Sequence, residues 1–204
     1  MAGREVAPVR PPRARDRGLT TLPSLIVVSG PPGSGKTTLA HELARAVGCP
    51  AVCRDEIKEG MVHATPGFTA APSDELTMRT LPVFFGVLEL LLRAGVTTVA
   101  EAAFQDQLWR PRLTPLLTLA RVRVVQCVTD PGVAARRVLR RKARDATRRA
   151  HADPGPDGAA GYAQRLAAFA RLRLDVPSLE VDTTSGYRPG LAEVVAFANG
   201  ARPA

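Results

Sequence analysis

A glycine-rich stretch near the N-terminus carries the residues best suited to chemistry. Residues 25–38 read LIVVSGPPGSGKTT, an apolar run followed by the spacing G-x-x-x-x-G-K-T. Glycines let backbone N–H groups point inward at an anion, and a helix that begins there directs its positive dipole end at the same place. The spacing and its flanks predict a phosphate-binding loop rather than an ordinary turn between a strand and a helix.

This loop assigns roles to individual side chains. Lys36 would reach the β- and γ-phosphates of a nucleoside triphosphate, and the Thr37 hydroxyl would bind Mg²⁺. We interpret the cofactors as ATP and Mg²⁺. The loop residues expected to contact the nucleotide are Gly30, Pro31, Pro32, Gly33, Ser34, Gly35, Lys36, Thr37 and Thr38.

A second charged run follows the strand expected at 51–54. Asp55 stands at its carboxyl end, on a strand expected to neighbour the loop, where parallel sheets bind ligands. It could meet an acceptor hydroxyl beside the γ-phosphate, although an aspartate that caps a short helix gives the same pattern. Lys58 could hold the substrate or the transferring phosphate, or lie at the surface. His63 is a further candidate base, but a loop histidine needs no chemistry.

A third apolar run, 96–100, ends in Glu101. A carboxylate at this strand end would coordinate Mg²⁺ together with Thr37, and we expect Glu101 to do so through a bound water. A carboxylate at the start of a helix would give the same sequence. The region 61–85, with Phe104 and Trp109, is expected to form the acceptor pocket.

Composition bounds the class of protein. The chain has 204 residues, 45% of them hydrophobic, which suits one domain with a full core. No apolar run approaches the roughly 20 residues of a membrane span, and no signal core precedes Pro23, so a cytoplasmic protein is expected. The three cysteines show no C-x-x-C spacing and no paired histidines, which favours buried thiols over a metal site.

The net charge of +9 is concentrated in two segments. Residues 1–18 carry five arginines against two acidic residues, and we interpret 1–22 as a disordered basic tail before a single domain, 23–204. Residues 131–151 carry eight basic residues against one acidic residue. Their helical spacing predicts part of a lid over the nucleotide, at about 132–165, or else a solvated basic face.

Apolar runs alternate with helical segments along the whole chain. The strands are expected at 25–29, 51–54, 96–100, 122–128 and 179–184. This order predicts an α/β fold of three layers with a five-stranded parallel sheet. A helix at 162–174 would complete the Arg-rich lid, and a last helix is expected at 191–198.

The pattern resembles the P-loop kinases of the nucleotide-kinase-like group over roughly residues 24–199. Within this group, the motif pattern is most similar to that of the small hydroxyl kinases, namely chloramphenicol phosphotransferase, zeta toxins, gluconate kinase and the kinase domain of polynucleotide kinases. The run Arg54-Asp55-Glu56-Ile57-Lys58 looks like the segment that carries their catalytic aspartate. This resemblance implies that Asp55 is the general base and that Lys58 stands where polynucleotide kinases use arginine.

The resemblance also implies how the nucleotide is covered. Thr183 and Thr184 lie in a run similar to the loop that packs on adenine, and Arg136 and Arg140 look like lid arginines. Glu101 departs from the aspartate that some relatives have at this position.

These assignments predict an ATP-dependent kinase that phosphorylates a hydroxyl group of a small molecule, such as an antibiotic, a sugar or a nucleoside-like compound. Asp55 would accept the proton, while Lys36, Mg²⁺ and the lid arginines would stabilise the transferring phosphoryl group. A 5′-hydroxyl polynucleotide kinase is the alternative, because nucleic acid would suit the basic segments. Against it, aromatic residues make up only 4% of the chain and are not interleaved with the basic ones. An ATP-driven switch is a third alternative, for which the chain leaves little room.

Overall fold

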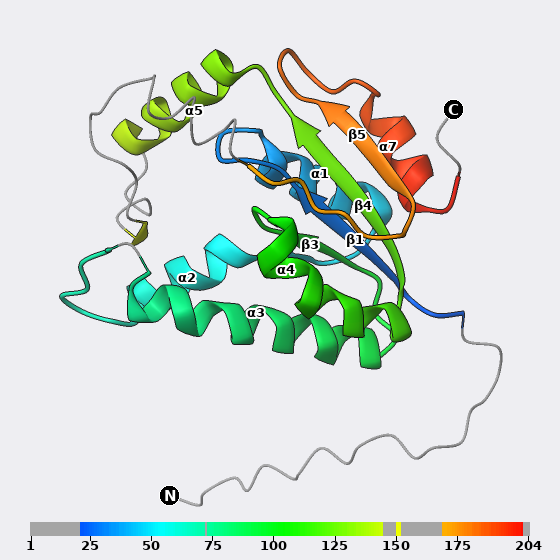
Figure 1. The fold of residues 1–204 in the computed structure, drawn as a ribbon, viewed down its shortest axis with the longest axis horizontal. Coiled ribbons are helices and arrows are strands. Elements are labelled where there is room, and N and C mark those ends of the chain that lie inside the picture. Colours follow the sequence, from blue (N-terminus) through cyan, green and yellow to red (C-terminus); the bar gives the residue numbers. More distant parts are fainter. Residues whose placement is uncertain (1–20, 72, 145–149, 152–168, 202–204) are drawn as a thin grey trace, which may run out of the picture.

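The computed structural model describes residues 21–71, 73–144, 150–151 and 169–201. Five parallel strands form one sheet in the order β2-β3-β1-β4-β5 (Figure 1). The strands are β1 (Ser24–Ser29), β2 (Ala51–Cys53), β3 (Thr98–Glu101), β4 (Arg121–Val128) and β5 (Ser178–Asp182). The helices are α1 (Lys36–Val47), α2 (Arg54–His63), α3 (Glu75–Arg93), α4 (Asp106–Leu113), the 3₁₀ helix η1 (Thr114–Thr118), α5 (Pro131–Arg144) and α7 (Leu191–Ala198). The expected α/β fold with a five-stranded parallel sheet is confirmed.

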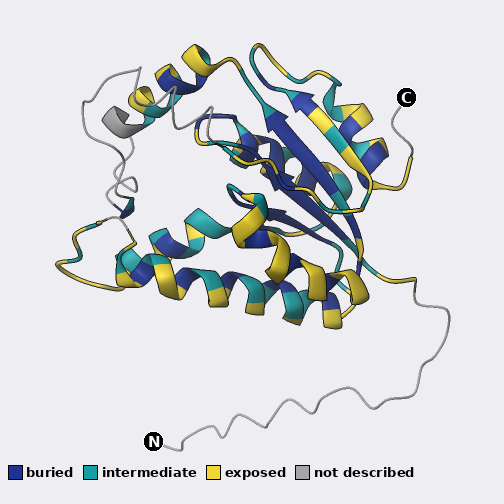
Figure 2. Ribbon diagram, in the orientation of Figure 1, coloured by how far each residue is buried: buried dark blue, intermediate teal, exposed yellow. Residues whose placement is uncertain are grey.

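Helices cover both faces of this sheet. Phe84 of α3 and Trp109 of α4 belong to the core on one face, whereas Leu43 of α1 and Phe197 of α7 belong to the core on the other. Figure 2 shows the result, with dark blue strands in the middle and exposed surface on the outer sides of the helices. Because β1 is enclosed on both faces, its sequence is apolar without alternation.

The strand register brings the carboxyl ends of β1, β2 and β3 together. Glu101, the last residue of β3, pairs with Val28 of β1 on one side and with Cys53 of β2 on the other. The strand next to β1 is therefore β3, and the expectation that β2 neighbours the phosphate loop is wrong. Asp55 follows β2 and is separated from β1 by the strand that carries Glu101.

Local signals set several helix boundaries. The Asp130 side chain accepts a hydrogen bond of 2.9 Å from the Val133 backbone N–H and so caps α5, whose first residue is Pro131. Asp74 caps α3 in the same way, accepting from the Thr77 N–H at 2.7 Å. α5 confirms the expected arginine-bearing helix.

The rest of the predicted lid differs or lies outside the described residues. Residues 169–174 are not helical, so the helix expected at 162–174 is wrong over this part. Their backbone bonds to other elements instead: the Gln126 side chain donates to the Leu172 carbonyl at 2.9 Å, and the Arg173 N–H donates to Asp106 at 2.8 Å. The tail at 1–20 and most of the lid beyond Arg144 lie outside the described residues.

The described helices include none that is both long enough and apolar enough to cross a membrane.

Candidate active site

The loop between β1 and α1 offers backbone and side-chain donors to an anion. Gly35 is the N-cap of α1 with φ +75°, and it has no side chain to cap the first N–H groups of the helix. Gly33 has φ +78°, and a Cβ there would lie 2.5 Å from the Ala134 carbonyl oxygen, so only glycine fits. The Ser34 hydroxyl is buried and has no hydrogen-bond partner among the described residues. This cradle fits a phosphate group.

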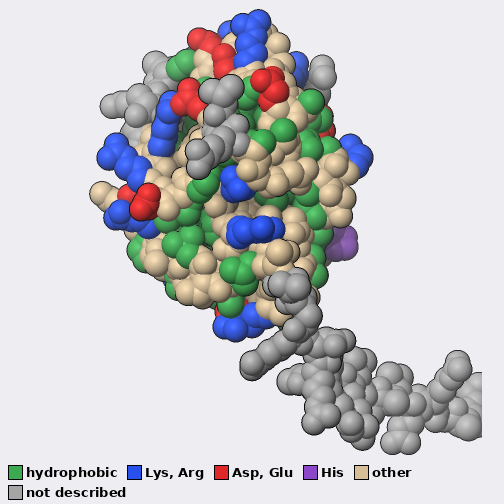
Figure 3. All heavy atoms as spheres, turned by 90° about the vertical axis from the view of Figure 1, so that its right-hand side faces the viewer, with side chains coloured by type: hydrophobic (Ala, Val, Ile, Leu, Met, Phe, Trp, Pro, Cys, Tyr) green, Lys and Arg blue, Asp and Glu red, His purple; other side chains and the backbone are tan. Residues whose placement is uncertain are grey.

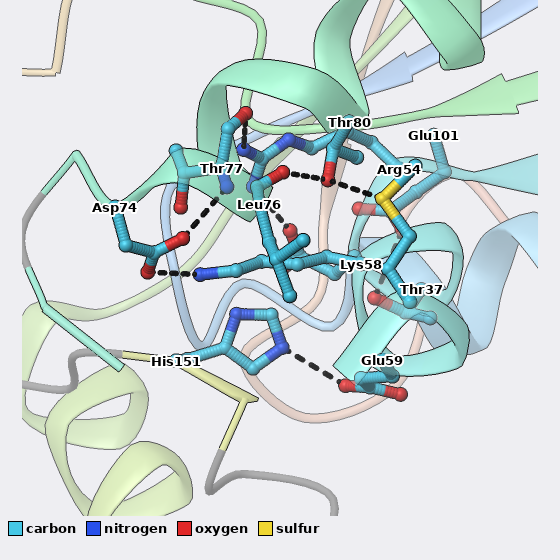
Figure 4. A network of polar contacts seen from close by, with 12 residues as sticks. Thr37, Arg54, Lys58, Glu59, Asp74, Leu76, Thr77, Thr80, Glu101 and His151 are labelled. Carbon is cyan, nitrogen blue, oxygen red and sulfur yellow. Dashed lines mark hydrogen bonds and ion pairs between the residues drawn. The ribbon is translucent and has the colours of Figure 1, made fainter. Parts of the chain in front are cut away.

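Glu101 connects the two residues that follow the glycines. Its carboxylate lies 3.6 Å from the Lys36 Nζ. It also accepts a hydrogen bond of 3.2 Å from the Thr37 hydroxyl, and both of these residues are labelled in Figure 4. The side chain is 2% exposed. Burial raises the pKa of Glu101 and nearby Asp55 raises it further, while Lys36 opposes both. The structure therefore brings together Lys36, Thr37 and Glu101, as the sequence predicted.

Thr37 and Glu101 also suit the predicted cation. Mg²⁺ prefers hard oxygen ligands and keeps several waters, and here a hydroxyl and a carboxylate lie together beside the phosphate loop. The residues present thus fit Mg²⁺, directly or through water.

Asp55 lies in the first turn of α2 and is held by a residue to which the sequence assigned no role. Arg54 donates to the Asp55 carboxylate at 2.9 Å and to the Thr77 carbonyl at 3.4 Å. Burial raises the pKa of Asp55, but the positive charges of Lys36, His151 and Arg54 outweigh this and hold it below its ordinary value. Its side chain is 43% exposed, so the carboxylate is partly accessible from solvent.

Lys58 lies in a buried ion pair. Its Nζ is 2.7 Å from the Asp74 carboxylate, and the two side chains are only 3% and 7% exposed. Burial opposes ionisation of Asp74, but hydrogen bonds from Lys58 and Thr77 lower its pKa to about 2. The alternative of a surface lysine is therefore wrong, and Lys58 joins α2 to the start of α3 (Figure 4).

Two histidines end up in different settings. His63 is the last residue of α2 and is exposed. His151, from the short described stretch after α5, lies 3.0 Å from the Glu59 carboxylate of α2 (Figure 4). The chain beyond α5 thus returns to the side of the sheet where Asp55 lies.

Arg137 of α5 contacts the phosphate loop. Its guanidinium donates to the carbonyl oxygens of Thr183 at 2.7 Å, Thr184 at 3.2 Å and Gly33 at 3.4 Å. The Thr183 hydroxyl in turn donates to the Ser34 carbonyl at 2.6 Å. The end of β5, predicted to approach the nucleotide, therefore lies against the phosphate loop.

A pocket of about 450 Å³ opens beside these contacts. Three residues predicted to lie at the nucleotide, Arg140, Thr38 and Thr183, line this pocket, whereas Arg136 is exposed and is not among the lining residues. The full lining is Gly35, Thr38, Arg137, Arg140, Arg141, Thr183, Gly186 and Tyr187. The i, i+4 spacing places Arg137 and Arg141 on one face of α5, and Arg136 and Arg140 on another, but this spacing does not say which face lies toward the loop.

The aromatic residues expected in the acceptor pocket belong to the core. Phe104 and Trp109 are buried, with ring centroids 4.8 Å apart, and both pack against Phe84. Their assignment to the pocket is wrong because α3 and α4 share one face of the sheet and close over them.

Comparisons with known proteins agree with this geometry. Residues 25–154 match the AAA_33 family model, described as an AAA domain. A protein provisionally named a kinase, from Chloroflexus aurantiacus j-10-fl, is 25% identical in sequence. Its structure has a TM-score of 0.77, covering 88% of this chain and 98% of that one.

Two further solved structures share the fold at lower identity. A gluconokinase from Sinorhizobium meliloti 1021 is 18% identical with a TM-score of 0.51, covering 87% of this chain and 89% of that one. The Mycobacterium tuberculosis APS kinase CysC, solved in complex with AMPPNP and APS, is 16% identical with a TM-score of 0.56, covering 87% and 98%. A search of curated proteins found no match.

Proposed function

Because the chain belongs to the AAA_33 family, a family of P-loop kinase domains, we propose that it is an ATP-dependent kinase whose acceptor is a hydroxyl group of a small molecule. One observation carries the proposal: Glu101 contacts both Lys36 and Thr37 of the phosphate loop, while Asp55, open to solvent, lies close enough to Lys36 for that charge to lower its pKa. These are the parts of a phosphoryl-transfer site. The solved gluconokinase and APS kinase with the same fold support this class of reaction.

The loop residues bind and neutralise the triphosphate. The N–H groups at the start of α1 donate to phosphate oxygens, and Lys36 adds a positive charge. Thr37 and Glu101 would hold Mg²⁺, directly or through water, and the ion would add charge neutralisation at the phosphates. Arg140 and Arg141 line the neighbouring pocket, where they contact the nucleotide.

Asp55 orients the acceptor. Its lowered pKa keeps it ionised at neutral pH, so it accepts a hydrogen bond from the substrate hydroxyl and takes the proton as the phosphoryl group is transferred. Arg54 fixes the direction of the carboxylate by donating to one of its oxygens. Most of the rate acceleration then comes from positioning and electrostatics.

Transfer of labelled γ-phosphate to a panel of acceptors tests the proposal. The panel contains sugars, nucleosides, antibiotics with free hydroxyls, adenylated sulfate and short oligonucleotides. With the acceptor found, Asp55→Asn should lower turnover by about 10²- to 10⁴-fold while a nonhydrolysable ATP analogue still binds. Asp175→Asn, at an exposed aspartate, is the matched control and should leave turnover unchanged. Near-normal turnover in Asp55→Asn would refute the assignment of the base.

An oligonucleotide acceptor is the alternative, favoured by the eight basic residues within 131–151. Away from that segment, on the face of β5 and α7 drawn in Figure 3, the described Lys and Arg side chains stand apart, separated by hydrophobic, acidic and uncharged surface. A continuous basic track along a strand would suit nucleic acid better. Phosphorylation of a 5′-hydroxyl oligonucleotide that falls steeply with salt concentration would select this alternative.

A further inference from the structure

Three potential metal ligands meet at the end of β2, and none of them belongs to the residues assigned to the phosphates. They are His41 of α1, Cys53 at the end of β2 and Glu56 of α2. The His41 Nε2 lies 2.6 Å from a Glu56 carboxylate oxygen and 3.7 Å from the Cys53 Sγ. All three ligand atoms lie within 4.8 Å of one another. We propose that these side chains bind one Zn²⁺ ion.

The ligand types select the cation. An imidazole nitrogen, a thiolate and a carboxylate oxygen form a mixed set that suits Zn²⁺, whereas Mg²⁺ and Ca²⁺ take oxygen ligands. Three protein ligands leave the fourth tetrahedral position to water. The site is thus chemically distinct from the oxygen ligands Thr37 and Glu101.

The distances require only a small adjustment. Zinc bond lengths of about 2.0–2.3 Å in a tetrahedral arrangement separate neighbouring ligand atoms by roughly 3.4–3.6 Å. The sulfur and nitrogen are already at 3.7 Å. The nitrogen and oxygen must separate from 2.6 Å, and both side chains have room to do so, because His41 and Glu56 are 44% and 47% exposed.

The position of Cys53 is set by the sheet. It pairs with Glu101 in the parallel ladder and is 2% exposed, so it forms the floor of the site while His41 and Glu56 form the rim. Burial raises the pKa of the Cys53 thiol, and the neighbouring carboxylates Glu101 and Glu56 raise it further. When Zn²⁺ binds, the S–H proton leaves to water and an S–Zn bond replaces it. The charge of the ion then offsets the same carboxylates that oppose a free thiolate.

Sequence spacing could not reveal this site. Eleven residues separate His41 from Cys53 and two separate Cys53 from Glu56, which is no recognised zinc motif. The cluster exists because α1 and α2 both pass the end of β2.

Metal titration of the full, untagged chain tests the proposal. After chelation and buffer exchange, Zn²⁺ is titrated calorimetrically in the presence of excess Mg²⁺, which occupies oxygen sites. We expect one Zn²⁺ per chain, and Co²⁺ substituted for it should give a thiolate-to-metal charge-transfer band. His41→Ala and Glu56→Gln should each weaken Zn²⁺ binding by more than about tenfold, the lower end of what losing an outer-shell partner costs.

Matched controls separate this site from adventitious binding. His63→Ala and Cys49→Ala change the same residue types outside the cluster and should bind Zn²⁺ as the parent does. Cys53→Ser should abolish the cobalt charge-transfer band, with circular dichroism confirming that the variant is folded. If Cys53→Ser fails to fold, the exposed His41 and Glu56 variants still decide the matter. Zinc affinity unchanged in both of them, or a Co²⁺ spectrum without a thiolate band, overturns the proposal.

Discussion

The Thr37 hydroxyl donates a 3.2 Å hydrogen bond to Glu101, joining the first turn of α1 to the end of β3. Since the same carboxylate lies 3.6 Å from the Lys36 Nζ, one buried acidic residue contacts two adjacent side chains of the phosphate loop, Lys36 and Thr37. A carboxylate that is enclosed in this way would be costly to bury alone, and its contacts with Lys36 and Thr37 offset that cost.

Replacement of Glu101 by glutamine should impair Mg²⁺-dependent turnover. Glutamine keeps the shape but removes the charge that holds Lys36 and draws the cation, so we expect turnover to fall by about 10²- to 10³-fold. The dependence of rate on Mg²⁺ concentration should shift to higher concentrations. Glu89→Gln, at an exposed ion pair on α3, is the control. If the variant kept the parental dependence on Mg²⁺ concentration, the assignment of Glu101 to the metal site would be refuted.

Arg137 and Arg136 offer a test within one helix. Arg137→Ala removes three donated hydrogen bonds to Gly33, Thr183 and Thr184, and should weaken binding of an ATP analogue by about tenfold or more. Arg136→Ala, one position earlier and exposed, should bind within about twofold of the parent. Equilibrium titration with a fluorescent nucleotide measures both. Equal losses in the two variants would mean that general charge, not the Arg137 contacts, holds the nucleotide.

Lys58→Met should destabilise the fold. It leaves the Asp74 carboxylate buried without its ion-pair partner, which costs about 3–5 kcal/mol of unfolding free energy. Urea denaturation measures the loss, and the double variant Lys58→Met/Asp74→Asn should recover part of it. If Lys58 also contacts the substrate, as the sequence predicted, turnover in the double variant should stay low after stability is restored. Full recovery of turnover would assign Lys58 a structural role alone.

Asp74 should make stability depend on pH in the acid range. Its pKa is lowered from the ordinary 3.8 to about 2, so its ion pair stabilises the folded state fully above pH 4. This contribution is lost as the pH falls from about 4 toward 2, because the unfolded chain takes up the proton first. The urea midpoint of the parent should therefore fall more steeply than that of Asp74→Asn between pH 4 and pH 2. Parallel pH profiles would contradict the shift.

Much of the fold and part of the candidate site could be predicted from contiguous stretches of the sequence. The loop from Gly30 to Thr38, an arginine-bearing helix within 131–151 and the helix Leu191–Ala198 were all predicted, because each depends on neighbours in sequence. Glycine backbone freedom, helix capping and apolar periodicity act within a few residues. The roles proposed for Lys36 and Thr37 therefore rest on the loop sequence alone.

The remaining features of the fold and site depend on how segments distant in sequence pack against one another. The place of β3 between β1 and β2 depends on which strands pair, and a local pattern does not encode that choice. Consecutive helical residues differ by about 100° in direction, so only docking of α5 on the loop selects Arg137 over Arg136. The burial of Lys58 against Asp74 depends in the same way on how α2 meets α3.

The sequence by itself thus predicted a nucleotide-binding loop and roughly where acidic residues would stand around it. Only the tertiary structure decided which of these residues touch: Glu101 with Thr37, Arg54 with Asp55, and His41 with Cys53 and Glu56. The physical reason is that these neighbouring side chains come from different strands and helices. The arrangement of those elements is fixed by burial of both faces of the sheet, and this burial depends on the whole chain.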